Sequence, residues 1–331
     1  MEEEARNFIN VWLMVLACVC YCYFVSSILP PGKLRLFSLL PVFSLFAVLP
    51  LRLSTVLPTS ILPLRLSTVL PTSVTSFFVT WLASFKLLLF SFSKGLLSSS
   101  PSSHPDPSKS LFLFILFTCF PIKIRQAQDY PSPQTLKLPL NLPSKLLLCG
   151  IGHPKLVLLL YSCMLYLYLD MILQMPSNEP YLSTSLQDFW GRRWNLTVTN
   201  ALWHTVYKPL KSFLEPRLRA TWAAAGAVMA AFLMSRLMHE LLYYYVTRAR
   251  ATWEVTGFFV LQGVCVVVEV AAKAAVGERW RLSRAMSTPL TVGFVVATAM
   301  WLFFPQLIRN GADERAIKER KAFVEGLRPK F

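Results

Sequence analysis

Long apolar stretches, separated by short polar segments, dominate the chain. Residues 8–29 carry no charge, and a helix of about 22 residues can cross a hydrocarbon core about 30 Å thick. Further stretches of this kind occupy residues 36–57, 74–93, 111–124, 146–172, 221–247, 252–275 and 287–308. The pattern predicts an all-α, polytopic integral membrane protein with about eight transmembrane helices. The stretch at 36–57 contains prolines and that at 111–124 is short, so either is also compatible with a re-entrant or interfacial piece.

Composition and charge agree with this prediction. Hydrophobic residues make up 54% of the chain and charged residues 15%, whereas soluble domains have about 45–50% and about 25%. A net charge of +16 would suggest nucleic acid in a soluble protein, but cations in short loops between apolar runs orient a polytopic chain in a bilayer. The seven cysteines lie in or beside apolar stretches. We therefore expect a membrane partner, no nucleic acid, buried thiols and no metal site.

The chain divides into three regions. Residues 1–120 hold the N-terminal spans and a tandem duplication, in which the sequence of residues 49–60 recurs at residues 62–73. Residues 121–320 form the predicted catalytic core, and residues 321–331 form a polar tail. Two copies with a period of 13 residues are too few for a repeat architecture, so the duplication is interpreted as a local insertion without function.

The distribution of cations predicts an orientation. Residues 309–331 carry seven Lys or Arg, which favours a cytosolic C-terminus. The cations on both sides of Asn195 favour the cytosol as well, so both positions are expected there. The acidic Met1–Glu4 segment favours a lumenal N-terminus, which would require an odd number of spans. One of the eight spans is then miscounted, or the N-terminus is cytosolic.

One predicted span carries a stripe of polar residues. Helical spacing of three and four residues places Ser235, Arg236, His239, Glu240 and Tyr243 along one side of the span at 221–247. An ionisable group at the bilayer centre costs about 2.5–3.5 kcal/mol on insertion scales, so such groups face a cavity or a partner. The stripe therefore predicts an intramembrane chamber.

Two interpretations of this stripe remain open. A neutral imidazole in an apolar chamber is a suitable general base, which makes His239 a candidate catalytic residue with its neighbours as a supporting shell. Alternatively, Arg236 and Glu240 neutralise each other in an ion pair, and His239 is only hydrogen-bonded beside them.

A second polar and aromatic cluster precedes this span. Trp190, Arg192, Arg193, Trp194 and Asn195 follow one another closely within a long connecting segment. Tryptophan favours the membrane interface and paired guanidinium groups suit phosphate, so the cluster is a candidate substrate-binding segment. An aromatic belt with snorkelling arginines is the alternative.

Three motifs together resemble a known family. The segment from Asp188 to Asn195, the sequence Met238-His239-Glu240 within an apolar helix, and Trp301-Leu302-Phe303-Phe304-Pro305 followed by Arg309-Asn310-Gly311 are similar to the plant wax synthase branch of the membrane-bound O-acyltransferase superfamily. The likeness covers about residues 120–320. Two positions depart from it: Arg236 stands where a small residue is expected, and Gln262 stands where relatives tend to have histidine.

The resemblance implies an activity and roles for residues. It implies a long-chain-alcohol O-fatty-acyltransferase of the endoplasmic reticulum membrane, whose helices enclose an intramembrane reaction chamber. His239 would be the catalytic general base and Asn195 its partner at the substrate carbonyl. Arg192 and Arg193 would meet the coenzyme phosphates, with Trp190 and Trp194 beside the substrate.

The implied partners are a fatty acyl-CoA cosubstrate, a fatty alcohol and membrane lipid, with no further cofactor; a second copy of the chain is a further candidate partner. Three alternatives remain open. The acceptor could be a sterol or a diacylglycerol, the protein could be a transporter that uses the polar stripe as its pathway, or it could be a membrane protein without catalytic activity, which Arg236 and the duplication would favour.

Overall fold

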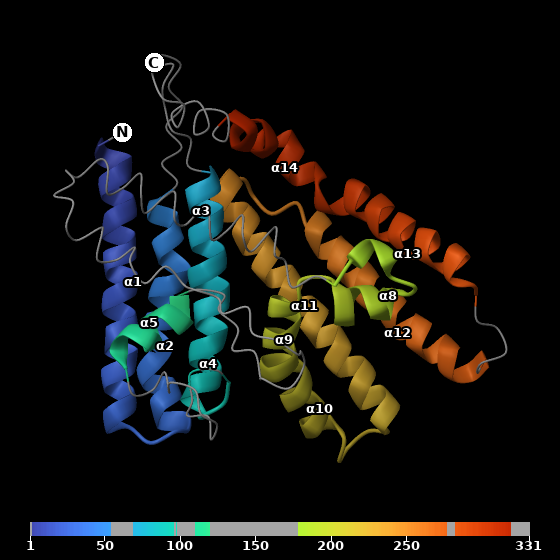
Figure 1. Ribbon diagram of the computed structural model, residues 1–331, viewed down its shortest axis with the longest axis horizontal. Helices are drawn as coiled ribbons and strands as arrows, with labels where there is room; N and C mark the ends of the chain where they lie inside the picture. Colours follow the sequence, from blue (N-terminus) through green and yellow to red (C-terminus); the bar gives the residue numbers. More distant parts are fainter. Residues whose placement is uncertain are drawn as a thin grey trace, which may run out of the picture.

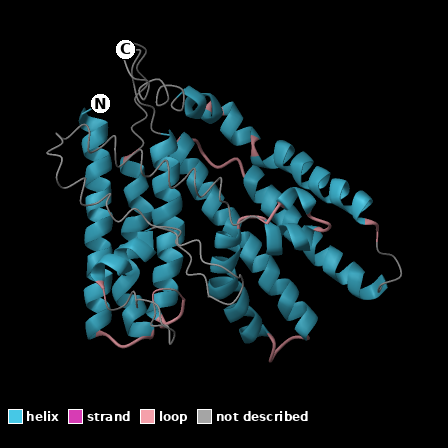
Figure 2. Ribbon diagram, viewed as in Figure 1, coloured by secondary structure: helices cyan, strands magenta, loops and turns pink. Residues whose placement is uncertain are grey.

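The computed structural model describes residues 2–53, 69–95, 97, 110–119, 178–276 and 282–318. Every regular element within these residues is a helix (Figure 2). Two groups of helices lie side by side, one from the N-terminal residues and one from the residues after 178 (Figure 1). The prediction of an all-α protein is confirmed for the described residues.

The N-terminal group, called here the N-terminal bundle, has three long helices side by side (Figure 1). Its third helix is composite, because a π-helical segment joins two α-helices. The elements are α1 (Glu2–Ile28), α2 (Lys33–Val48), η1 (Leu49–Arg52), α3 (Val69–Thr75), η2 (Ser76–Ala83), α4 (Ser84–Ser91) and α5 (Leu111–Cys119). Their apolar sequences pack into one core, in which Val15, Phe46 and Phe78 are fully buried.

A buried arginine holds the corner between α1 and α2. The last carbonyl groups of a helix have no partner within it, and the guanidinium of Arg35 donates to two such groups, at 2.6 Å from the Leu29 oxygen and 3.0 Å from the Ser26 oxygen. The same guanidinium lies over the ring of Phe90 in α4, 5.2 Å from its centroid. One cation therefore ties α1, α2 and α4 together.

The second group is arranged around α11 (Ala220–Thr247), which runs beside α12 (Figure 1). Several short helices precede α11 and pack against it or α12. The remaining elements are η4 (Pro180–Leu182), α8 (Leu186–Asp188), η5 (Phe189–Arg193), α9 (Leu196–Leu202), η6 (Trp203–Tyr207), α10 (Lys208–Leu214), α12 (Glu254–Val276), α13 (Arg284–Thr298), η8 (Ala299–Phe303) and α14 (Pro305–Arg309).

The end of α11 joins the two groups. The hydroxyl of Tyr245 donates to the Ala47 carbonyl, and the guanidinium of Arg248 donates to the Leu51 carbonyl. Along its length α11 also packs against α3 and η2. The space beside α11 is therefore bounded by both groups.

Six helices in the described residues are long and apolar enough to cross a membrane. They are Arg6–Ile28, Lys33–Arg52, Thr72–Ser91, Ala220–Thr247, Glu254–Ala275 and Arg284–Arg309. Each corresponds to one of the eight predicted spans. The prolines do not break the second span, because α2 continues through Pro41 and η1 extends it.

The other two predicted spans are not among these six. The described part of the stretch 111–124 is α5, whose nine residues reach only about 13.5 Å at 1.5 Å per residue. The expectation that it crosses as a complete helix finds no support there. The stretch 146–172, most of the duplicated segment and the tail 321–331 lie outside the described residues.

The expectation that Asn195 and the C-terminus share the cytosolic side stays a prediction, and it conflicts with the span count. Three candidate spans, Ala220–Thr247, Glu254–Ala275 and Arg284–Arg309, follow Asn195. If all three cross, the chain ends on the opposite side of the membrane from Asn195. The positive-inside bias does not decide between the sides, because cations occur at both ends of α11, with Arg219 before it and Arg248 after it.

We predict opposite membrane sides for an epitope tag inserted after Glu215 and one appended to the C-terminus. A third tag, inserted at Leu282, is two candidate spans from Glu215 and should share its side. Antibody access in cells with only the plasma membrane permeabilised, against fully permeabilised cells, reads out each position. If the Glu215 and C-terminal tags are accessible under the same condition, one of the three helices does not cross.

Candidate active site

A cavity of about 770 Å³ lies between the N-terminal bundle and the helices around α11. Its wall is almost entirely apolar and aromatic, with rings from η2, η5, η6 and η8. The polar side chains at its surface include Gln187, Asn195, Thr199, Ser235 and His239. Of the four histidines, His239 lines this cavity, whereas His104 and His153 lie outside the described residues.

The imidazole of His239 is held in one tautomer. Its Nδ1 lies 2.8 Å from the backbone oxygen of Ser235. A carbonyl oxygen can only accept a hydrogen bond, so Nδ1 carries the proton and the neutral ring presents Nε2 as a proton acceptor. No hydrogen bond joins Nε2 to another described residue. Among the described residues, the acceptor nitrogen is therefore left without a partner, which a general base requires.

Three aromatic rings surround this imidazole. Their centroids lie 4.6 Å (Phe259), 4.8 Å (Trp81) and 5.4 Å (Phe303) from that of His239. They come from α12, η2 and η8, far apart in the sequence. Sequence reasoning did not find these neighbours. Phe303 belongs to the third motif of the family resemblance, but nothing along the chain connects it with His239.

Only part of the polar stripe of α11 faces the cavity. Ser235 and His239 line the cavity, whereas Arg236, Glu240 and Tyr243 do not. Glu240 accepts a hydrogen bond of 2.8 Å from Thr256 of α12. The hydroxyl of Tyr243 donates to the Phe303 carbonyl at 2.7 Å. These two contacts fasten α11 to the other walls of the site.

The opposite side of α11 is apolar and exposed. Leu233, Leu237 and Tyr244 recur there at helical spacing and are each more than a third exposed. This surface suits lipid, as expected for a span whose polar stripe faces protein.

The self-neutralising ion pair is not formed. Across the described residues, no ion pair joins Arg236 and Glu240, and Arg236 Nε and Glu240 Oε2 are each buried without a hydrogen-bond partner. The guanidinium of Arg236 lies instead over the ring of Trp253, 5.9 Å from its centroid. The interpretation of His239 as a bystander to such a pair loses its basis.

Asn195 reaches the cavity from the start of α9. Its backbone is left-handed, with φ +37°, a conformation that asparagine tolerates better than most residues. As the N-cap, its Oδ1 accepts a hydrogen bond of 3.3 Å from the Val198 N–H. The amide nitrogen Nδ2 forms no hydrogen bond with the described residues, so a donor remains at the cavity.

Trp190 is anchored in the cavity wall by a buried polar chain. Its indole N–H donates to Gln262 Oε1 at 3.0 Å, and Gln262 Nε2 donates to Thr298 Oγ1 at 2.8 Å. Gln262 is fully buried and both ends of its amide are satisfied. The glutamine at this position therefore links η5, α12 and α13. Trp194 also lines the cavity and stacks on Phe189, with ring centroids 5.5 Å apart.

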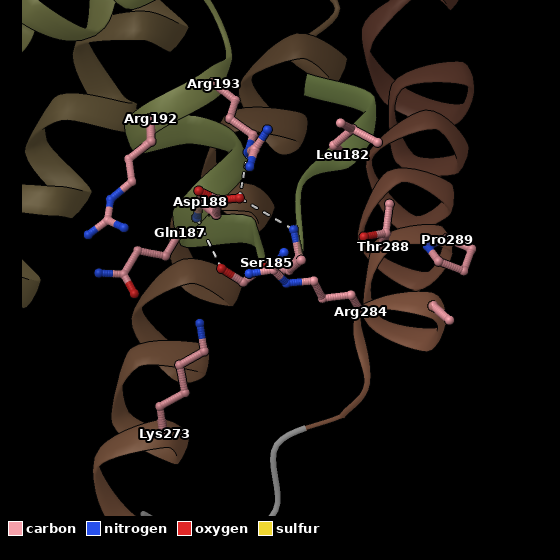
Figure 3. A pocket seen from close by; sticks show the side chains of 12 residues that line it. Leu182, Ser185, Gln187, Asp188, Arg192, Arg193, Lys273, Arg284, Thr288 and Pro289 are labelled. Carbon is pink, nitrogen blue, oxygen red and sulfur yellow. Dashed lines mark hydrogen bonds and ion pairs between the residues drawn. The ribbon is translucent and has the colours of Figure 1, made fainter. Parts of the chain in front are cut away.

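A second cavity, of about 810 Å³, adjoins the first and is polar (Figure 3). Gln187 lines both. Its cationic side chains come from three elements: η5, α12 and α13. They are Arg192, Arg193, Lys273 and Arg284. The close-up shows them on the walls of one space, with Asp188 between Arg193 and Ser185 (Figure 3).

The four cations are not equivalent. Arg193 is engaged, with its Nε 2.6 Å from Asp188 Oδ2 and its Nη1 donating to the Asn178 and Glu179 carbonyls. Lys273 pairs with Glu269 at 2.5 Å. Neither Arg192 nor Arg284 forms an ion pair with any described residue. The sequence indicated the Arg192–Arg193 pair but gave no sign that Lys273 and Arg284 would join it.

The second described histidine lies outside the cavity. Burial, with added repulsion from Lys208 and Lys94, lowers the pKa of His204 below its usual 6.5. His204 is therefore neutral near pH 7, but it does not line the chamber. Proximity to the cavity, not the protonation state, distinguishes His239.

Comparison with known proteins identifies relatives of the whole chain. Residues 175–261, which include Asn195 and His239, match the Membrane bound O-acyl transferase family. The long-chain-alcohol O-fatty-acyltransferase of Simmondsia chinensis is 42% identical over 352 residues, covering 96% of this chain and 94% of that protein. Probable long-chain-alcohol O-fatty-acyltransferase 3 of Arabidopsis thaliana is 40% identical over 359 residues, covering 100% and 98%. The likeness thus extends beyond residues 120–320, into the N-terminal bundle.

Proposed function

This chain belongs to the long-chain-alcohol O-fatty-acyltransferases of the membrane-bound O-acyltransferase family, and we propose that it joins a long-chain fatty alcohol to a fatty acyl-CoA in the apolar cavity, giving a wax ester and CoA. One observation carries this assignment of the site. His239 and Asn195, which lie on different helices, line the same apolar chamber. One offers a proton acceptor and the other a hydrogen-bond donor, the two groups that acyl transfer to an alcohol needs.

The proposed reaction uses both groups in one addition and elimination. His239 Nε2 removes the hydroxyl proton as the alcohol oxygen attacks the thioester carbonyl, forming a C–O bond. Asn195 Nδ2 donates to the carbonyl oxygen as negative charge develops on it. The C–S bond then breaks, and the CoA thiolate takes the proton from the imidazolium. The Ser235 carbonyl keeps Nδ1 protonated throughout, so the ring always works through Nε2.

The apolar wall suits the substrates and protects the intermediate. Alkyl chains transfer favourably from water into such a wall, at about 0.8 kcal/mol per buried methylene. Aromatic side chains such as Trp190, Trp194 and Phe303 leave few polar groups to hold water near the thioester. Exclusion of water favours transfer to the alcohol over hydrolysis.

We assign the CoA phosphates to the second cavity. Arg192 and Arg284 have no carboxylate partner among the described residues, and guanidinium groups bind phosphate oxygens in pairs of hydrogen bonds. Lys273 lies beside them with its ammonium group already paired to Glu269. Arg193 is already paired with Asp188, and we propose that this pair stabilises the conformation of the segment that carries Arg192 and Trp190. The shared Gln187 supports a continuous path for one substrate across both cavities.

The protein is a multi-pass membrane protein. The count of eight spans enclosing the chamber stays a prediction, of which six have helices long enough to cross. We place the protein in the endoplasmic reticulum membrane, as its family resemblance implies. Assembly with a second copy stays a prediction. A transporter is not favoured, because the relatives that match the whole chain are named as acyltransferases.

Replacement of the general base tests the assignment most directly. In a yeast strain lacking its own neutral-lipid acyltransferases and fed fatty alcohol, the wild type should produce wax ester. His239→Ala should reduce the rate about 10²–10⁴-fold, because general base catalysis is lost. His204→Ala, which removes a histidine outside the cavity, is the matched control. If His239→Ala produces as much wax ester as the wild type, His239 is not part of the mechanism. If the wild type produces steryl ester or triacylglycerol in place of wax ester, the acceptor is a sterol or a diacylglycerol.

The donor role of Asn195 can be separated from its capping role. Asn195→Asp keeps an oxygen that accepts from the Val198 N–H but removes the Nδ2 donor. We expect the purified variant to keep its thermal unfolding midpoint while kcat falls about 10²–10³-fold, the usual effect of losing one oxyanion donor. An aspartate variant with wild-type kcat would show that the amide donor is dispensable.

The phosphate assignment predicts a selective effect on one substrate. Arg192→Gln and Arg284→Gln should each raise KM for the acyl-CoA about tenfold or more, since a charge-assisted hydrogen bond contributes about 1.5–3 kcal/mol. KM for the alcohol should change little. Lys211→Gln removes a cation that is paired with Glu215 away from either cavity and serves as control. If KM for the acyl-CoA equals the wild-type value in all three variants, the phosphates bind elsewhere.

A further inference from the structure

The N-terminal bundle supplies part of the wall of the chamber. Phe77 and Trp81, both in η2, line the same cavity as His239. Trp81 is only 5% exposed, and its ring meets the imidazole edge to face, with centroids 4.8 Å apart and planes at 70°. Phe77 also packs against the indole, with ring centroids 5.3 Å apart. A residue more than 150 positions from His239 is thus in direct ring contact with it.

The local backbone explains how Trp81 reaches the cavity. η2 is π-helical, and a π turn carries one more residue than an α turn, which turns the following side chains about the helix axis. Four elements in the described residues are π-helical, namely η2, η5, η6 and η8, and each contributes rings to this one cavity. Single π turns are frequent at functional sites. The π turn of η2 belongs to this set although it lies in the N-terminal bundle.

The hydrogen bond to Ser235 fixes only one edge of the imidazole. Phe259 and Phe303 cover two further sides from α12 and η8, and Trp81 covers the side of the N-terminal bundle. Figure 1 shows the composite helix of α3 and α4 beside α11, which is the contact that brings Trp81 to His239. Removing the indole would open space beside the imidazole for water or for a reoriented ring.

We propose that Trp81 is a positioning residue for acyl transfer, which holds the imidazole of His239 towards the alcohol and keeps water from taking the alcohol's place. This inference rests on the proposed function of His239. With water in place of the alcohol, the water oxygen attacks the thioester carbonyl, the C–S bond breaks, and fatty acid and CoA are released. The ratio of fatty acid to wax ester therefore reports the role of Trp81 separately from overall stability.

Two substitutions of Trp81 distinguish the effect of its aromatic ring from the effect of the volume that it fills. Trp81→Phe keeps an aromatic face, whereas Trp81→Met fills much of the space with a flexible chain. In purified enzyme, Trp81→Met should lower kcat about 10–100-fold, in line with the cost of misplacing a reacting group, with KM for both substrates within about threefold. The ratio of fatty acid to wax ester should rise. Trp81→Phe should restore most of both properties.

Phe78→Met is the matched control. Phe78 is three residues away on the same π-helical segment and fully buried, but it lies in the core of the N-terminal bundle and does not line the cavity. Its kcat and product ratio per folded molecule should be those of the wild type. If Trp81→Met behaves like Phe78→Met, or if Trp81→Phe is as impaired as Trp81→Met, the proposal is wrong.

The outcome separates this proposal from the proposed function. Loss of ester synthesis in His239→Ala, together with a wild-type product ratio in Trp81→Met, overturns only the role of Trp81. Full activity of His239→Ala overturns both. Should Trp81→Met fail to accumulate, the product ratio of Trp81→Phe still decides, because an indole that positions His239 through its ring predicts a ratio near that of the wild type.

Discussion

The hydrogen bond from His239 Nδ1 to the Ser235 carbonyl determines what the apolar cavity can do. An imidazole surrounded by hydrocarbon is neutral only as one of two tautomers, and its acceptor nitrogen lies wherever the proton does not. Because the backbone oxygen one helical turn earlier accepts from Nδ1, Nε2 is the acceptor. The aromatic rings therefore pack around an imidazole whose acceptor nitrogen is already defined. Without this bond, either ring nitrogen could carry the proton, and the direction of the candidate base would not be set.

The two adjoining cavities separate the two kinds of chemistry in the substrates. The first is apolar and holds the base and the asparagine donor; the second is polar and cationic. A fatty acyl-CoA has the same division, with an alkyl chain at one end and phosphates at the other. Gln187 belongs to both walls, and the paired Arg193 and Asp188 hold the segment that separates them. In the proposed binding mode, the polarity of the substrate would orient it, with the thioester at the boundary between the cavities.

The catalytic core does not end where its motifs end. Tyr245 and Arg248 donate to backbone carbonyls of α2 and η1, and Trp81 brings the N-terminal bundle into contact with His239. The division into an N-terminal region and a catalytic core stays a prediction, and residues from both regions line the same cavity. The similarity to relatives over the whole chain is consistent with this.

Sequence alone determined the helical class, six candidate spans and the candidate base His239, because span length and the cost of ionisable groups in lipid are properties of a single helix. Asn195 became a candidate catalytic residue only through the family resemblance. The sequence did not determine which members of the α11 stripe face the cavity, since helical spacing gives a face about 100° wide, while the packing of α12 and η8 divides it between Ser235 and Tyr243. The sequence also did not determine that Asp188 forms an ion pair with Arg193, or that Lys273 and Arg284 line the same cavity as Arg192. Arg192 and Arg284 are 92 positions apart along the chain, and only the tertiary structure brings them to one cavity.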